Sequence, residues 1–325
     1  MSGRKRKRRT APAPPPSTRR TAVADPEERA PRRSGLFGSA LFGGGASALP
    51  PIGRSLGRGL VAVASQPALV VLSCVLVVGT WLVLVAIGFE GTPSRLVDVL
   101  AMPPISTYFD LGTGASLYGI GPAFLAYLGV SIGVRTLVYS VLSGLVLEAL
   151  EDGRVSRVGV LRGMQALPTV LVVQVASFSL IVAGNLIFPV LGPGIGFLGF
   201  VSALVAGLFF LGFAPTAAIR EGRPVMETIR RSARAAMLPG GRHLVLSSLY
   251  FFLALPVVVG FAPGGDITAN PSLGTWIFVL LVNVLHVAFM AAFAYRWVVA
   301  EPAVPEEPVR RRTPTRTPPA AARRR

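Results

Sequence analysis

The 325-residue chain is poor in the side chains that most often carry chemistry. It has one cysteine, Cys74, and two histidines, and its only lysines are Lys5 and Lys7. A single cysteine excludes an intramolecular disulfide. Because carboxylates are also scarce within the apolar parts of the sequence, too few ligands remain for a conventional zinc or di-iron site. We therefore expect neither a metal nor another cofactor.

Sequence motifs of catalysis are missing as well. The chain contains no phosphate-binding loop, no GxSxG nucleophile motif and no HExxH metalloprotease motif. No pair of carboxylates is placed as it would be in a catalytic cleft. The sequence therefore favours a protein that is not an enzyme.

What the chain has in abundance is apolar sequence. Hydrophobic residues make up 52% of it and charged residues only 14%, a composition typical of an integral membrane protein. Six runs approach or exceed the roughly 20 residues that cross a bilayer core, and lipid leaves such runs no alternative to helix. They predict an all-α, polytopic membrane protein with six transmembrane helices, at about Pro67–Phe89, Leu117–Leu147, Leu167–Pro189, Ile195–Ala217, Leu244–Phe261 and Leu273–Val299.

The 32 basic residues, against 15 acidic ones, alternate along this pattern. Thirteen precede the first run, and the five connections hold one, three, none, six and none; eight lie at the C-terminal end, counted from Arg296 near the end of the last run, and Arg135 lies within a run. The positive-inside rule then places both termini and the second and fourth connections in the cytoplasm, in a multi-pass protein of the cytoplasmic membrane. This explains a net charge of +17 without a nucleic-acid partner.

The two ends of the chain differ from its middle. Residues 1–58 combine basic clusters with Pro- and Gly-rich stretches, and residues 301–325 repeat this composition. Such segments bury too little apolar surface to fold, so we predict two disordered cytoplasmic tails. They flank a transmembrane domain over residues 59–300.

The fourth connection, residues 220–243, is basic and amphipathic. Pro224 suits a helix start and Pro239-Gly240-Gly241 a helix stop, while Glu227 lies one turn before Arg231. A short basic helix tied to spans at both ends is expected to lie among anionic lipid headgroups. The alternative is that it only links two spans and packs on the bundle. The residues predicted to contact lipid or another anion are Arg135, Arg154, Arg230, Arg231 and Arg234.

The second and fourth connections resemble each other. Glu151-Asp152-Gly153-Arg154 and Arg220-Glu221-Gly222-Arg223 each follow an apolar run and precede an amphipathic stretch, which predicts a repeated helical hairpin. The sequences EDGRVSRVGVLRGMQALPTVLVV and EGRPVMETIRRSARAA also resemble the six-helix membrane domain fused to some glycerophosphoryl diester phosphodiesterases and related uncharacterised prokaryotic membrane proteins. That resemblance spans about residues 65–299 and implies the membrane architecture alone, because the hydrolase is a separate soluble barrel.

Arg135 is a basic residue near the middle of an apolar run. A charge at the bilayer centre is costly and marks a functional site by default, although its helix, about 50 Å long, leaves room for a structural or snorkelling role. Since no other run has an acidic residue near its middle, we expect Tyr139, a carbonyl, water or a bound anion as its partner.

Three further polar residues lie within the runs. Gln174, Asn283 and His286 form a predicted intramembrane cluster whose usual role is hydrogen bonding between helices, with a proton relay as the alternative. Gly129 and Gly133 form a GxxxG pair that allows close helix contact, either within one chain or between copies, so a homo-oligomer remains open. The first connection, residues 90–116, contains the apolar stretch SRLVDVLAM, which predicts an interfacial helix or lid, or a simple cover over helix ends.

The sequence thus favours a non-enzymatic accessory or lipid-interacting protein whose partners are membrane lipids, anionic headgroups above all. The alternative is a small-molecule or lipid transporter with a polar site near Arg135. A polar central cavity that contains Arg135 and His286 would favour transport, whereas a solid bundle would favour the accessory role.

Overall fold

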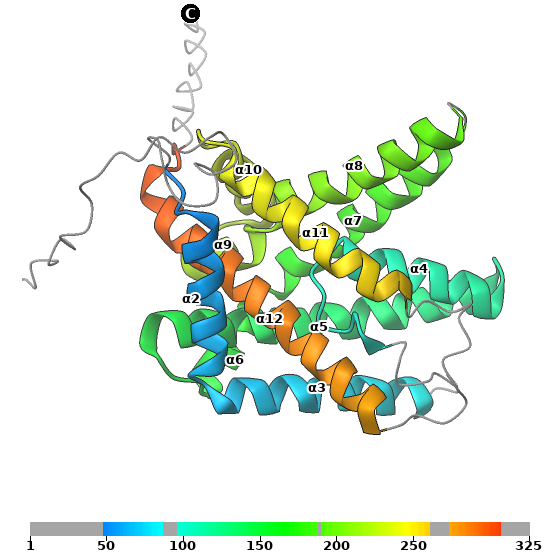
Figure 1. Cartoon of the computed structure of the whole chain (residues 1–325), viewed down its shortest axis with the longest axis horizontal. Coiled ribbons are helices and arrows are strands. Elements are labelled where there is room, and N and C mark those ends of the chain that lie inside the picture. Colours follow the sequence, from blue (N-terminus) through cyan, green and yellow to red (C-terminus); the bar gives the residue numbers. More distant parts are fainter. Residues whose placement is uncertain (1–47, 87–95, 188–189, 191, 261–272, 307–325) are drawn as a thin grey trace, which may run out of the picture. The chain divides into compact units, whose positions relative to one another are not determined.

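The fold was analysed in a computed structural model of the chain, which describes residues 48–86, 96–187, 190, 192–260 and 273–306. These residues fall in a single compact unit, and their regular structure is entirely helical, which confirms the all-α prediction (Figure 1). The helices are α2 (Ile52–Ala64), α3 (Pro67–Ala86), α4 (Ile105–Tyr118), α5 (Pro122–Asp152), α6 (Arg157–Gln165), α7 (Leu167–Ile187), α8 (Pro193–Leu211), α9 (Ala214–Glu221), α10 (Val225–Ala236), α11 (Arg242–Gly260), α12 (Leu273–Ala300) and the 3-10 turn η3 (Glu301–Ala303).

The described parts of all six predicted apolar runs are mainly helical, but the lengths of the helices differ. By length and composition, four helical stretches suffice to cross a membrane: Pro122–Asp152, Leu167–Ile187, Gly194–Glu221 and Leu273–Ala303. A fifth arises if α2 and α3, which meet at 84°, count as one bent span. Because only Arg242–Ala254 of α11 qualifies, as a shorter apolar helix, the protein has four or five membrane-spanning candidates among the described residues, and a count of six is not confirmed.

Glycine ends the helices at both predicted repeat sites. Gly153 follows α5 with φ 63°, and Gly222 follows α9 with φ 59°. This left-handed conformation suits glycine and stops a helix. A short helix and then a long apolar helix come next in both places, α6 and α7 after the first glycine and α10 and α11 after the second. The two connections therefore share local geometry as well as sequence.

Three short helices, α2, α6 and α10, each precede a long apolar helix and pack on another one. Helix α2 lies along α12, α6 lies along α5, and α10 lies against α8 and α9 (Figure 1). Glycine permits the closest of these contacts: a Cβ on Gly144 of α5 would lie 2.1 Å from the Gly159 carbonyl of α6, and one on Gly59 of α2 would lie 2.3 Å from the Ala288 carbonyl of α12.

The predicted domain boundaries need correction at both ends. Helix α2 begins at Ile52, ahead of the predicted boundary at residue 59, and Val304 beyond the boundary at 300 is buried. The reason is the spacing of Ile52, Ser55, Gly59 and Ala62, which puts one buried face on α2. The rest of the two predicted tails, residues 1–47 and 307–325, lies outside the described residues.

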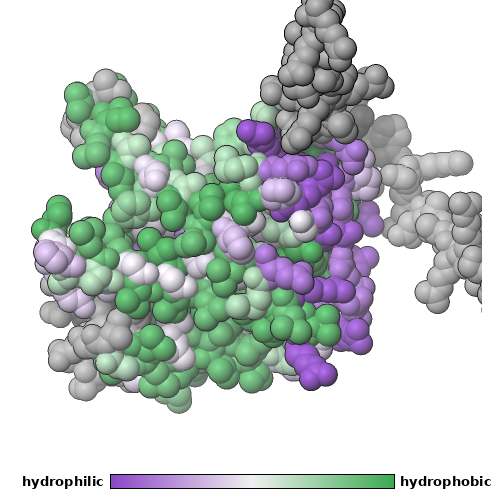
Figure 2. Space-filling view, turned by 180° about the vertical axis from the view of Figure 1, so that it is seen from behind, coloured by the Kyte–Doolittle hydropathy of each residue, from purple (hydrophilic) through white to green (hydrophobic). Residues whose placement is uncertain are grey.

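The ends of three long helices meet in a network of ion pairs. Arg220 of α9 pairs with Glu151 at the end of α5 and, at 2.7 Å, with Glu301 just after α12. Figure 2 shows hydrophilic side chains gathered along one side of the molecule, with hydrophobic side chains over most of the remaining face. The exposed arginines of the short helices and their connections are Arg54, Arg58, Arg154, Arg157 and Arg230.

Candidate functional site

The most unusual part of the fold is the non-helical segment that leads into α4. Residues 96–102 are all buried, with exposed fractions between 1% and 6%, although Asp98 carries an ionisable group. Backbone in such a place must find partners for its N–H and C=O groups within the protein. In this segment, side chains of three long helices supply several of them.

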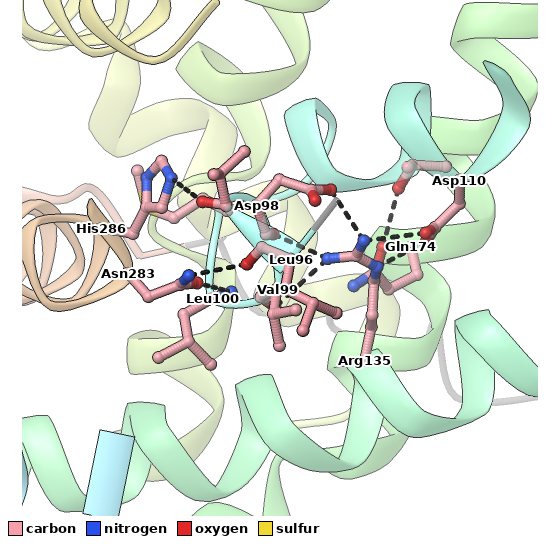
Figure 3. Close-up of polar contacts among 12 residues, drawn as sticks. Leu96, Asp98, Val99, Leu100, Asp110, Arg135, Gln174, Asn283 and His286 are labelled. Atoms are coloured by element: carbon pink, nitrogen blue, oxygen red, sulfur yellow. Dashed lines mark hydrogen bonds and ion pairs between the residues drawn. The ribbon is translucent and has the colours of Figure 1, made fainter. Parts of the chain in front are cut away.

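Arg135 of α5 binds the segment most extensively (Figure 3). Its Nη1 donates to the carbonyl oxygens of Asp98 and Val99, at 2.7 and 3.2 Å. Its Nη2 lies 2.7 Å from Oδ2 of Asp98 and 2.8 Å from Oδ1 of Asp110, and its Nε lies 2.6 Å from Oδ2 of Asp110. The guanidinium group therefore binds the carboxylate of Asp110 in α4 through two nitrogens, and it binds both the backbone carbonyl and the side chain of Asp98.

Asn283 and His286 of α12 hold the same segment from the other side (Figure 3). The Asn283 side chain accepts from the Leu100 N–H at 2.8 Å and donates to the Leu96 carbonyl at 2.7 Å. His286 Nε2 lies 3.1 Å from the Val97 carbonyl, so it donates and leaves Nδ1 as an acceptor. Nδ1 lies 3.0 Å from the hydroxyl of Tyr250.

Two more contacts complete the set. The Tyr250 hydroxyl of α11 accepts from the Met102 N–H at 2.9 Å. Gln174 of α7 accepts from the Thr107 hydroxyl of α4 at 2.8 Å. The predicted polar cluster of Gln174, Asn283 and His286 thus gathers around one stretch of chain, residues 96–110, and Arg135 belongs with it.

Charge is not balanced within this cluster. Two buried carboxylates, Asp98 and Asp110, share the single guanidinium of Arg135. Burial is the main reason why the pKa of Asp98, in the connection between α3 and α4, rises to about 6; the Arg135 charge opposes this rise and Asp110 adds to it. The pKa of this carboxyl group is thus higher in the folded protein than in an unfolded chain.

One expectation about this region was incomplete and another was wrong. The partners of Arg135 include the carboxylates of Asp98 and Asp110, which were not expected, alongside the carbonyls that were. Residues 96–102 form neither an interfacial helix or lid nor a cover over helix ends, because they pass into the bundle interior. The sequence feature that could have indicated this placement is a pair of carboxylates in the connection after the first apolar run. They are Asp98 and Asp110, which lie 37 and 25 residues before Arg135.

The arginines predicted to contact lipid separate into two groups. Arg135 and Arg231 are buried and paired with carboxylates, Arg231 with Glu221 at 2.8 Å. The predicted pairing of Arg231 with Glu227 is wrong, because Glu227 pairs with Arg223. Arg154 and Arg230 are exposed, and Arg234 is half-buried and donates to the Pro305 carbonyl at 3.1 Å.

The bounds of helix α10 match their prediction, but its buried face differs from the apolar one expected, because it includes Arg231 and leaves Met226 exposed. The helix runs from Val225 to Ala236, with Pro224 just before it and positive-φ glycines at 240 and 241 beyond it. Its buried face is Thr228, Arg231, Ser232, Ala235 and Ala236. The GxxxG pair of α5 makes no close helix contact within the described part of the chain, because a Cβ on Gly129 or Gly133 would meet no atom within 4 Å.

The space beside the cluster is small. A pocket between α11 and α12, lined by Tyr250, Leu253, Val282, Leu285 and His286 among others, has a volume of about 30 Å³, enough for one or two water molecules. The described residues contain no group of three or more histidine, cysteine or carboxylate side chains that could hold a metal ion. The polar side chains bind and orient the chain itself, and the arrangement supplies no activated nucleophile.

Comparisons with known proteins add no family to this description. No family model, no curated protein and no solved structure matches the chain.

Proposed function

We propose that the protein is a non-enzymatic, lipid-interacting accessory protein of the cytoplasmic membrane, with both termini in the cytoplasm. The observation that carries this proposal is the pairing of exposed arginine with exposed apolar side chains on the short helices. Arg58 and Val61 share α2, and Arg157 and Leu161 share α6; Leu161 is 63% exposed. Met226 and Arg230 repeat the pattern on α10, with Met226 60% exposed.

The physical reason is the layered structure of a lipid surface. A helix that lies at the boundary between headgroups and acyl chains presents cations to the phosphates and apolar side chains to the hydrocarbon. Each arginine near an anionic surface contributes about 1 kcal/mol. Three helices of this kind around one end of the bundle make anionic lipid the preferred neighbour, and they support the inward placement of the second and fourth connections.

Transport, the alternative function, requires a polar cavity at Arg135 that a solute can occupy. Here the guanidinium of Arg135 and the imidazole of His286 bind residues 96–110 of the protein's own chain. This occupancy favours the accessory role. The resemblance to the membrane domain associated with glycerophosphoryl diester phosphodiesterases fits the same proposal, since it concerns membrane architecture and not hydrolysis.

The test is competitive lipid retention by the full chain. The protein is purified from equal amounts of phosphatidylglycerol and phosphatidylcholine, and the retained lipid is quantified. The wild type should be enriched in phosphatidylglycerol. A triple variant, R58Q/R157Q/R230Q, should lose this enrichment several-fold because it removes one cation from each short helix.

The matched control is R58K/R157K/R230K, which keeps the three charges and should keep the enrichment. Raising the salt concentration should weaken retention by the wild type, since exposed charges are screened. Equal retention ratios for the wild type and the glutamine variant would contradict the proposal.

A further inference from the structure

Four arginines are buried in the described part of the chain: Arg135, Arg231, Arg242 and Arg296. The first two have carboxylate partners within 3 Å. Neither Arg242 nor Arg296 forms an ion pair with any described carboxylate, although their exposed fractions are only 6% and 0%. A buried charge without a counter-charge is among the costliest arrangements in a protein.

The two arginines lie close together. Arg242, the first residue of α11, donates through Nη1 to the Leu49 carbonyl at 2.8 Å. Arg296, near the end of α12, donates through Nη1 to the Pro50 carbonyl at 2.9 Å and to the Ser55 hydroxyl at 3.2 Å. Because Leu49 and Pro50 are consecutive residues, hydrogen bonds to their carbonyls bring the two guanidinium groups within roughly 10 Å of each other.

One edge of the Arg296 guanidinium group has no hydrogen-bond partner. Its Nε and Nη2 are buried and have no hydrogen-bond partner. These two nitrogens form the edge that binds two oxygens of a carboxylate or a phosphate side by side. Arg135 uses this same edge to hold both oxygens of Asp110. At Arg296, no described carboxylate binds this edge.

The surroundings favour an anion over water. His243 and Trp297, the residues that follow the two arginines, both pack on Phe213, with ring centroids 4.0 and 5.7 Å away. All three rings are buried, and a buried environment strengthens electrostatic attraction. The N-terminus of α11, which begins at Arg242, adds a partial positive charge. Water would satisfy the N–H groups but would leave two positive charges uncompensated.

We propose that Arg242 and Arg296 form a binding site for one phosphate group, held by the Nε–Nη2 edge of Arg296 and by the charge of Arg242. The phosphate belongs either to a lipid headgroup or to a free phosphate ion. Where the phosphate belongs to a lipid, this site rests on the proposed lipid interaction and gives it one defined position.

The test is native mass spectrometry of the full chain after extensive detergent washing. The wild type should retain one phosphate-bearing adduct per chain. Its mass distinguishes a phospholipid from inorganic phosphate, and the latter is also added as a probe to delipidated protein. R296K should reduce this retention at least tenfold, because lysine keeps the charge but offers no two-nitrogen edge.

The control variant is R162Q, which changes an arginine of α6 that pairs with Glu151 at 3.6 Å, and it should retain the adduct in full. Thermal unfolding shows whether R296K is folded; if it is not, R242Q, which removes the second positive charge, takes its place and should likewise lower retention. Absence of any adduct from the wild type, or equal retention by the lysine variant, would mean that only carbonyls and water hold these arginines. A retained adduct together with unchanged lipid preference in R58Q/R157Q/R230Q would overturn the proposed function and leave this site standing.

Discussion

Arg135 shows what one buried guanidinium group can organise. It contacts two carboxylates and two carbonyls, so three separate parts of the chain, α4, α5 and the segment before α4, meet at one side chain. Removing it would leave Asp98 and Asp110 buried without a cation. Breaking a buried pair in this way typically costs about 3–5 kcal/mol, far more than an exposed pair contributes.

We therefore expect R135Q to lower the free energy of unfolding by about 3–5 kcal/mol. Denaturant titration of the protein in detergent measures this loss. The matched control is R154Q, because Arg154 pairs with Glu148 at 3.7 Å and its side chain is 68% exposed. The control should change stability by less than about 1 kcal/mol. Similar stability for R135Q and the wild type would refute a structural role for the cluster.

Repeating this denaturant titration at several pH values measures how Asp98 contributes to the free energy of unfolding. The pKa of Asp98 is raised to about 6 in the folded protein, against about 3.9 in an unfolded chain. The folded state then binds more protons between these values, so the contribution of Asp98 to stability falls as pH rises from about 4 to 6. D98N should remove this decline. An unchanged slope in D98N would mean that Asp98 does not titrate in this range.

At the scale of helices, close packing depends on glycines that the sequence pattern did not single out. Gly144 of α5 faces Gly159 and Gly163 of α6, and a Cβ on Gly144 would lie 2.1 and 2.5 Å from their backbone atoms. Backbone cannot move aside as a side chain can. The contact between α5 and α6 is therefore intolerant of even one added methyl group.

Accordingly, G144A should destabilise the protein by about 1–3 kcal/mol through overpacking. Thermal unfolding in detergent is a suitable measurement. G129A is the natural control, since Gly129 lies on the same helix and a Cβ there would meet no atom within 4 Å. Alanine should leave stability unchanged or raise it slightly at that position, because it favours helix over glycine. Equal effects at the two positions would argue against this contact.

At the scale of the whole molecule, the proposed topology places the two ends of α5 on opposite sides of the membrane. The helix has 31 residues and is about 46 Å long. Ile120, just before α5, is 94% exposed. The other end of α5 lies near Arg220, in the stretch that leads into α10. Arg230 of α10 should consequently lie on the side opposite Ile120.

Cysteine labelling tests this arrangement. In a C74A background, I120C should react with a membrane-impermeant maleimide from outside the cell, and R230C only after the membrane is opened. Both positions are exposed, so a difference in reactivity reports their side of the membrane. Labelling of both from the same side would rule out the proposed topology.

Much of the helical layout followed from local sequence. The apolar runs predicted helices because lipid leaves backbone no other partner, and the bounds of α10 followed from proline before it and glycine after it. Asn283, His286 and Gln174 could be grouped because polar side chains in apolar helices seek each other. Their shared target, residues 96–110, could not be predicted, since a short apolar stretch with one aspartate suits an interface as well as an interior.

The sequence by itself determined the class of the protein and the positions of its long helices, because hydrophobic length and glycine and proline signals act locally. Only the tertiary structure decided which charges meet. It gave Arg135 its two aspartates and Arg231 its glutamate, and it brought Arg242 beside Arg296 without a carboxylate. Ion pairing depends on distances across the bundle between residues far apart in the chain, and no periodicity along the sequence encodes them.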